Sequence, residues 1–245
     1  MKGVILAGGL GTRLHPLTKV TNKHLLPVYD KPMIYYPLQT LVSSGVTDIL
    51  IVTGGPWAGE FLSLLGNGKE FGLKHLNYTY QSGEGGIADA LSLAEHFAAD
   101  QPILLMLGDN FLEKPIKAAV DEFRGNPRGA KIFCTRVEHP EWYGVVELAG
   151  DKVARIVEKP KEPKSNLVAI GVYMYDNSVF EKIRKIEPSA RGELEITDVN
   201  NLYLREGQLR YDIIDGWWAD AGESFEMWLK ANMLAASLQG VKISL

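Results

Sequence analysis

The sequence contains a single cysteine in 245 residues, Cys134, so no disulfide can form within the chain. Cys134 lies in the apolar run from Lys131 to Val137, where a buried structural thiol is expected, and we assign it no chemistry. The 5 histidines show no metal-ligand spacing, and neither a nucleophile elbow nor a His-Glu-x-x-His motif occurs. The lack of these motifs argues against a zinc hydrolase and against catalysis by a protein nucleophile.

An excess of basic charge and a long hydrophobic run are also missing. The chain has 26 Lys and Arg against 30 Asp and Glu, a net charge of −4, and therefore no electrostatic footprint for nucleic acid or an anionic membrane. No apolar run approaches the roughly 20 residues of a bilayer span, and Met1-Lys2 leads into a glycine-rich stretch rather than into a signal sequence. We expect a cytoplasmic protein with no nucleic-acid or membrane partner.

The first half of the chain alternates short β-type runs with helical patterns. Strands are expected at Val4 to Ala7, Asp48 to Thr53, Leu76 to Tyr80 and Ile103 to Leu107, and helices at 33–44, 56–65 and 86–98. Such alternation predicts an α/β fold, with a Rossmann-like, mostly parallel sheet flanked by helices. Ligands of these sheets bind beyond the carboxyl ends of the strands, where Gly8, Gln81 and Asp109 fall.

The second half has a different pattern. Four β-type runs at 130–137, 143–148, 152–157 and 168–175 are separated by Pro, Gly and charged turns. Helices are expected at 194–206 and 224–238, with a short strand at 209–214 between them. We expect additional strands, some antiparallel, within a single domain that spans 1–245, because no linker forces a division.

The most informative stretch lies within the first thirty residues. The run Val4 to Ala7 opens onto Gly8-Gly9-Leu10-Gly11-Thr12-Arg13, and Lys23 follows. Glycines leave no Cβ in the way, so successive backbone N–H groups can converge on an anion. Arg13 can hold a phosphate through two parallel hydrogen bonds, and Lys23 supplies a compact charge. The stretch therefore predicts a phosphate-binding loop.

Other interpretations of this loop are less favoured. It is not a Walker A motif, because no Gly-Lys-Ser/Thr follows at the required spacing. It is an imperfect dinucleotide fingerprint, because Leu14 replaces the third glycine and Asp30 lies in a turn between Pro27 and Pro32 rather than at the end of a strand. A nicotinamide-dependent dehydrogenase is therefore a distant alternative, and a tight turn without a ligand is the simplest one.

Two aspartates have a similar apolar lead-in. Asp109 follows Ile103 to Leu107 through Gly108, and Asp220 follows Trp217-Trp218-Ala219 and precedes Ala221-Gly222. Two carboxylates beside bound phosphates commonly hold Mg²⁺. Either aspartate alone could instead be a turn or N-cap residue.

Four further residues bear polar groups that could contact a ligand. Gln81 ends a strand, and its amide can both donate to and accept from a pyrimidine edge. Glu158 closes another strand and could bind sugar hydroxyls, while Lys159 and Arg191 could bind a second phosphate. The alternative for these charged residues is a solvated loop.

Taken together, these motifs resemble one family, the sugar-1-phosphate nucleotidylyltransferases. The resemblance runs in order from Met1 to about Ala236 and rests on the stretches Gly8 to Thr18, Asn22 to Val28, Leu107 to Asn110, Glu158 to Pro160, Arg191 to Thr197 and Trp218 to Gly222. It is strongest to the members that transfer a thymidylyl group from dTTP to α-D-glucose 1-phosphate. Their products are pyrophosphate and dTDP-glucose, the first intermediate of deoxysugar biosynthesis of the dTDP-rhamnose type.

The resemblance implies a role for each motif. Residues about 1–110 would form the nucleotide-binding half and about 130–222 the sugar-phosphate-binding half, with Arg13 and Lys23 catalytic. The implied nucleotide-binding residues are Gly8, Gly9, Gly11, Thr12, Arg13, Lys23, Gln81, Gly86 and Asp109. The implied sugar-phosphate-binding residues are Gly144, Glu158, Lys159, Val172 and Arg191, with Gly144 and Val172 contributing backbone groups. Asp109 and Asp220 would hold Mg²⁺.

The chain also departs from the family pattern. His24 and Asp89 stand near the nucleotide end, where dTTP-using members commonly carry glutamine. A UTP-using or relaxed enzyme is therefore one alternative, and a non-catalytic nucleotide-sugar sensor on the same fold is another. The chain ends at Leu245 without the C-terminal extension from which longer members build an allosteric site and part of a tetramer, so the resemblance does not extend to feedback inhibition; a homo-oligomer is possible.

Overall fold

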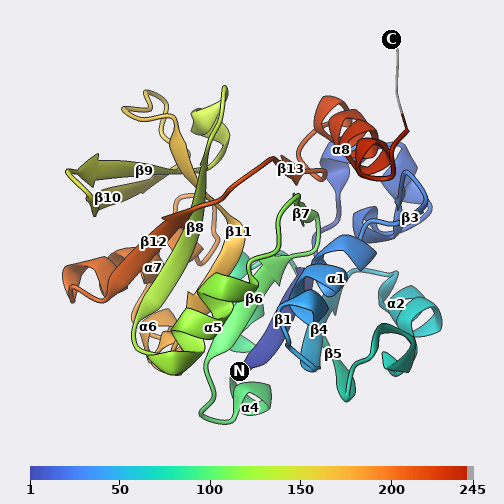
Figure 1. Ribbon diagram of the computed structural model, residues 1–245, viewed down its shortest axis with the longest axis horizontal. Coiled ribbons are helices and arrows are strands. Elements are labelled where there is room, and N and C mark those ends of the chain that lie inside the picture. Colours follow the sequence, from blue (N-terminus) through green and yellow to red (C-terminus); the bar gives the residue numbers. More distant parts are fainter. Residues whose placement is uncertain (242–245) are drawn as a thin grey trace.

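The computed structural model describes residues 1–241 and contains a nine-stranded sheet covered by helices (Figure 1). Its strands are β1 (Lys2–Ala7), β4 (Asp48–Gly54), β5 (His75–Gln81), β6 (Ile103–Leu107), β8 (Ala130–Arg136), β9 (Gly144–Ala149), β10 (Lys152–Glu158), β11 (Leu167–Tyr175) and β12 (Leu209–Ile213). The strand order is β10-β9-β11-β6-β1-β4-β5, with β8 paired to both β11 and β12. The predicted α/β fold is confirmed.

The first half of the chain forms the parallel part of the sheet. Strand β1 pairs in parallel with β4 and β6, and β4 pairs in parallel with β5. The helices that follow are α1 (Tyr35–Ser43), α2 (Ala58–Leu65), α3 (Ile87–Ser92) and α4 (Glu95–Ala98). The prediction of a single helix over 86–98 is wrong, because this segment forms the two helices α3 and α4. The backbone tightens between α3 and α4, where Ala94 N–H donates to the Leu91 carbonyl.

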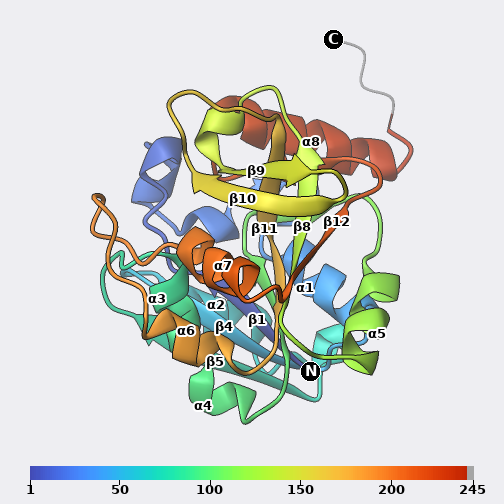
Figure 2. The same ribbon diagram turned by 90° about the vertical axis from the view of Figure 1, so that its left-hand side faces the viewer.

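The second half adds the antiparallel part. Strand β11 pairs antiparallel with β6, β8 and β9, and β9 pairs antiparallel with β10. The sheet therefore continues from one half of the chain into the other. In Figure 2, the β9–β10 hairpin lies across the upper end of the molecule, above α7 (Ile196–Arg205).

Several short elements were not predicted. These are α5 (Lys117–Gly125), α6 (Val179–Ile183) and two small sheets. In one, β7 (Asn110–Leu112) pairs antiparallel with β13 (Trp218–Asp220), and in the other, β2 (Pro27–Val28) pairs antiparallel with β3 (Lys31–Pro32). The predicted helix over 194–206 begins two residues late, at Ile196. Leu194 remains extended because its N–H donates to the Gly85 carbonyl at 2.8 Å and its carbonyl accepts from Ala88 N–H at 3.1 Å.

Apolar clusters pack on the two faces of the sheet, and β11 contributes to both. Its residues Ala169, Tyr173 and Tyr175 belong to one cluster, whereas Ile170, Val172 and Met174 belong to the other. Cys134 is fully buried, as predicted. The C-terminal helix α8 (Phe225–Leu238) packs through Ala231 and Ala235 on a third, smaller cluster. Among residues 1–241, no helix combines the length and apolar character that a membrane crossing needs.

Candidate active site

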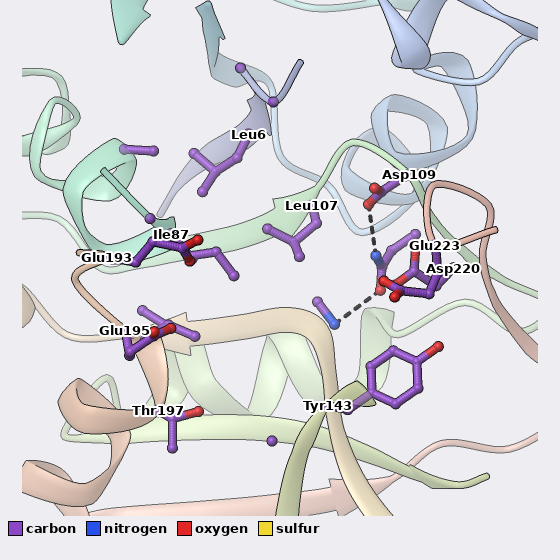
Figure 3. A pocket seen from close by; sticks show the side chains of 18 of the residues that line it. Leu6, Ile87, Leu107, Asp109, Tyr143, Glu193, Glu195, Thr197, Asp220 and Glu223 are labelled. Carbon is purple, nitrogen blue, oxygen red and sulfur yellow. Dashed lines mark hydrogen bonds between the residues drawn. The ribbon is translucent and has the colours of Figure 1, made fainter. Parts of the chain in front are cut away.

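A cleft of about 450 Å³ lies beyond the carboxyl ends of the parallel strands and is lined by residues from both halves of the chain. Gly8, Gln81 and Asp109, each at or just beyond the end of a strand, all line it. Figure 3 shows Asp109, Asp220 and Glu223 gathered at one end of the cleft, and Glu193, Glu195 and Thr197 toward the other. The sequence stretches that suggested phosphate, metal and sugar binding thus meet in one place.

The glycine loop approaches the cleft through only part of its length. Gly8, Gly9 and Arg13 line the cleft. Gly11 and Thr12 are not among its lining residues; Thr12 is exposed, and Gly11 has a φ of +66°. A Cβ on Gly11 would lie 2.9 Å from Lys23 Cβ, so this glycine packs the loop against the segment that carries the lysine.

Lys23 and Asp109 form an ion pair at the end of the cleft where Asp220 and Glu223 also lie, with Nζ and Oδ2 2.5 Å apart. Burial lowers the pKa of Lys23, but the carboxylates of Asp109 and Asp220 outweigh burial and raise it above its ordinary value. Burial also opposes ionisation of Asp109, yet the Lys23 ammonium holds the pKa of that carboxyl well below its usual range. Both members of the pair are therefore charged near neutral pH.

The β7–β13 pairing brings Asp220 to Asp109. Asp220 is opposite Asn110 in the register, and Ala221 N–H donates to the Asp109 carbonyl at 3.0 Å. Burial and the Asp109 carboxylate raise the pKa of Asp220 to about 8. Gly222 completes the contact, because a Cβ there would overlap Asp109 Oδ2 and lie 2.7 Å from Lys23 Nζ.

These carboxylates suit a cation that the substrate helps to bind. Within residues 1–241, no set of three or more His, Cys, Asp or Glu side chains is placed to hold a metal ion. Mg²⁺ needs only one or two carboxylates when phosphate oxygens and water complete its octahedron. The mutual repulsion that raises the pKa of Asp220 is what a divalent cation beside both aspartates would relieve.

A second ion pair joins Arg13 to Glu223. The Arg13 guanidinium donates from Nη1 to Glu223 Oε2. Burial raises the pKa of Glu223 above its ordinary value, although Arg13 opposes this. The sequence interpretation did not single out Glu223, and its only signal was its place directly after Asp220-Ala221-Gly222.

Gln81 lies beside Gly8, the first residue of the glycine loop. Its Nε2 donates to Asp89 Oδ2 at 2.7 Å and to the Gly86 carbonyl at 3.3 Å. Gly86 lines the cleft with a φ of +94°, and a Cβ there would lie 2.7 Å from the Leu194 carbonyl. A side chain at this glycine would therefore collide with the extended backbone that precedes α7.

His24 lines the cleft as a neutral imidazole. Asn22 Oδ1 accepts from His24 N–H at 2.9 Å and lies 2.7 Å from His24 Nδ1. Burial, followed by the Lys23 charge, lowers the pKa of His24 to about 3. Since a carboxamide oxygen only accepts, Nδ1 bears the ring proton.

The opposite end of the cleft is built from β10, α7 and the segment that precedes α7. Thr197 Oγ1 donates to Glu158 Oε2 at 2.5 Å, and a Cβ on Gly144 would lie 3.1 Å from Thr197 Oγ1. Burial raises the pKa of Glu158 despite the Thr197 hydrogen bond. Lys159 follows with a φ of +41° and lines the cleft.

Arg191 forms a fork with Glu195 at this end. Its Nη2 lies 2.8 and 2.9 Å from the two Glu195 carboxylate oxygens and 3.6 Å from Glu158 Oε1. Burial lowers the pKa of Arg191, but the Glu195 hydrogen bonds more than offset this and raise it. The guanidinium is therefore fixed in place beside Glu158.

Val172 lies beside the cleft rather than in its wall. Its side chain belongs to the apolar cluster on the opposite face of β11, while the neighbouring Gly171 and Tyr173 line the cleft. A Cβ on Gly171 would lie 2.6 Å from Leu107 Cγ, so this glycine keeps the cleft floor open. Lining residues that the sequence interpretation did not single out as site residues include Trp142, Tyr143, Tyr173, Thr197 and Glu223.

The chain matches the family described as nucleotidyl transferase over residues 2–237. It is 44% identical over 249 residues to the glucose-1-phosphate thymidylyltransferase of Actinoplanes sp., covering 99% of this chain and 82% of the relative. A Bacillus anthracis protein assigned as a glucose-1-phosphate thymidylyltransferase, crystallised with sucrose, superimposes with a TM-score of 0.92 at 46% identity and covers 100% of this chain and 98% of that one. A UDP-glucose pyrophosphorylase in complex with UDP-glucose shares the fold, with a TM-score of 0.82 at 23% identity and coverage of 97% and 98%. The chain belongs to the nucleotidyl transferase family.

Proposed function

We propose that this protein is a glucose-1-phosphate thymidylyltransferase that uses Mg²⁺ and acts in the cytoplasm. It would transfer the thymidylyl group of dTTP to α-D-glucose 1-phosphate and release dTDP-glucose and pyrophosphate. The observation that carries the proposal is one cleft that holds Gln81 at one position, Lys23, Asp109 and Asp220 at a second, and Glu158 with Arg191 at a third. The similarity to relatives with this name over nearly the whole chain supports it.

The reaction needs no protein nucleophile. An oxygen of the sugar phosphate attacks the α-phosphorus of the nucleotide in line, and pyrophosphate leaves from the opposite side. Positioning and charge neutralisation then supply the catalysis. Lys23 suits this role because its pKa is raised and it stays protonated. Arg13, whose side chain is half-exposed, would exchange Glu223 for the departing pyrophosphate.

Asp109 and Asp220 are the residues that would hold Mg²⁺. When bound, this ion neutralises charge on the triphosphate. The ion pair between Asp109 and Lys23 fixes the carboxylate in position. His24, beside Lys23, is neutral and therefore adds no positive charge that would repel the Mg²⁺ ion. Its ring proton is on Nδ1, so Nε2 donates no hydrogen bond.

Residues about 130–222 would bind the sugar phosphate, and about 1–110 the nucleotide. Glu158 would accept hydrogen bonds from sugar hydroxyls, with Thr197 holding the carboxylate in place. Lys159 and Arg191 would contact the sugar phosphate. Gly144 leaves room beside Glu158, and Val172 would contribute backbone rather than side-chain contacts.

The proposal is tested by pyrophosphate release from dTTP and from UTP, each with glucose 1-phosphate and Mg²⁺, and with EDTA as a control. We expect release that EDTA abolishes and that is faster with dTTP. The margin should be modest, because one methyl group contributes only about 1–3 kcal/mol in an apolar pocket. Tight dTTP binding without release from either nucleotide would contradict the enzyme and support the sensor alternative.

A further inference from the structure

The carboxylate of Asp89, in the first turn of α3, accepts a hydrogen bond from the side-chain amide of Gln81. Gln81 is the last residue of β5 and is 7% exposed. Its Nε2 lies 2.7 Å from Asp89 Oδ2, the shorter of its two hydrogen bonds. This contact joins the strand end to the helix directly behind the proposed nucleotide pocket.

The chemistry of the two acceptors fixes which way the amide faces. A carboxylate and a backbone carbonyl accept hydrogen bonds and donate none. Turning the Gln81 amide over would place Oε1 against Asp89 Oδ2 and the Gly86 carbonyl, where repulsion replaces two hydrogen bonds. Oε1 is therefore directed toward Gly8, where a Cβ would lie 3.1 Å from it. Gly8 lines the cleft, so the group that Gln81 offers a ligand is an acceptor.

We infer that Asp89 is a positioning residue that sets base selectivity by holding Gln81 as a hydrogen-bond acceptor. The inference rests on the proposed function only in taking Gln81 to meet the base of a pyrimidine nucleotide. Thymine and uracil present an N3–H donor at the pairing edge, whereas cytosine presents a lone pair at the same atom. An acceptor fixed in the pocket favours the first two bases and leaves cytosine with opposed lone pairs.

The bond to Gly86 is the weaker of the two, at 3.3 Å. The second N–H of the amide can therefore also meet a carbonyl oxygen of the base while Asp89 keeps the first. Asparagine at position 89 could donate as well as accept, so the amide of Gln81 would gain a second allowed orientation. The selectivity against cytosine then falls without any change in the shape of residue 89.

Calorimetric binding of dTTP and dCTP, with Mg²⁺ and without a sugar phosphate, tests the inference. Wild type should bind dTTP more tightly, and Asp89→Asn should reduce the ratio of the dCTP and dTTP dissociation constants about tenfold. Glu95→Gln is the matched control, because Glu95 is a carboxylate on the neighbouring α4 that pairs with the exposed Arg184. It changes the net charge equally and should leave the ratio unchanged.

Equal weakening of dTTP and dCTP by Asp89→Asn, an unchanged ratio, or no preference in wild type would each overturn the inference. Selective binding without pyrophosphate release would contradict the proposed reaction while leaving this inference supported.

Discussion

Lys23 Nζ and Asp109 Oδ2 lie 2.5 Å apart although 86 positions separate the two residues in the chain. The pair joins Lys23, a proposed catalytic residue, to Asp109, a proposed metal ligand. It raises the pKa of the lysine and lowers that of the aspartate, so both side chains stay charged. Asp220 reaches the same place from a third segment. A substitution at any of the three residues therefore changes the pKa of the other two. Because Asp109 pairs with Lys23 and Asp220 does not, substitutions at the two aspartates should differ in their effect on stability.

Asp109→Asn and Asp220→Asn should each reduce turnover by at least about 100-fold, because each removes a carboxyl group that would hold Mg²⁺ against the triphosphate. Their effects on stability should differ. Asp109→Asn leaves the buried Lys23 without its partner and should cost about 3–5 kcal/mol, whereas Asp220→Asn removes a carboxyl whose pKa burial raises to about 8 and should cost little.

Pyrophosphate release and urea denaturation of the two variants measure these effects. Turnover near the wild-type rate in either variant would exclude that residue from the metal site. Equal loss of stability in both would contradict the assignment of the Lys23 ion pair to Asp109.

Gly222→Ala should inactivate the enzyme, because the new Cβ would overlap Asp109 Oδ2 and displace Lys23. We expect a loss of stability of about 1–3 kcal/mol as well. Gly59→Ala is the control, since a Cβ within α2 at that position has nothing within 4 Å and should stabilise the helix slightly. An active Gly222→Ala enzyme would show that the close contact is not needed for catalysis.

Glu223→Gln should lower the KM for dTTP about three- to fivefold. Glu223 occupies the guanidinium of Arg13, whose side chain is 52% exposed, so the pair contributes at most about 1 kcal/mol. A triphosphate that recruits Arg13 must first displace Glu223, and the variant removes that competition. Steady-state kinetics against dTTP decide the point; a raised KM would mean that Glu223 assists binding instead.

His24 should make folding stability depend on pH. Its pKa is about 3 in the folded protein and near 6.5 in the unfolded chain. The unfolded chain therefore binds more protons between these values, and stability falls as the pH drops below 6.5. Between pH 6.5 and 4.5 the loss from this residue is about 2–3 kcal/mol.

Urea denaturation of wild type and His24→Gln at pH 7.5 and 4.5 isolates this contribution. Glutamine does not titrate, so the variant should lose about 2–3 kcal/mol less than wild type between the two pH values. Identical losses in the two proteins would show that folding does not lower the pKa of His24.

The parallel strands and the glycine loop could be predicted because their signals are local. The run Ile103 to Leu107 is apolar on both faces and leads to Asp109, as buried parallel strands do. The loop that begins at Gly8 combines closely spaced glycines with an arginine directly after a buried strand, a composition typical of anion binding. The remaining assignments came from the resemblance to a family, because that resemblance depends on all the motifs and on their order along the chain.

The meeting of Asp109 with Asp220 could not be read from the chain. It depends on β7 and β13, which have three residues each and are too short to show a hydrophobic period. The side of β11 that faces the cleft was equally hidden, because all nine residues from Leu167 to Tyr175 are buried and no polar alternation marks one face. The resemblance implied the backbone near Val172 for sugar binding, and it is the neighbours of Val172, Gly171 and Tyr173, that line the cleft.

The most direct test of the proposed function is to follow the α-phosphate of dTTP. The protein is incubated with α-³²P-labelled dTTP, glucose 1-phosphate and Mg²⁺, and the labelled product is separated and identified by mass spectrometry. We predict that the label appears in dTDP-glucose in a 1:1 ratio with released pyrophosphate. Label that stays in dTTP, or that appears in dTMP without a sugar nucleotide, would contradict the proposed transferase.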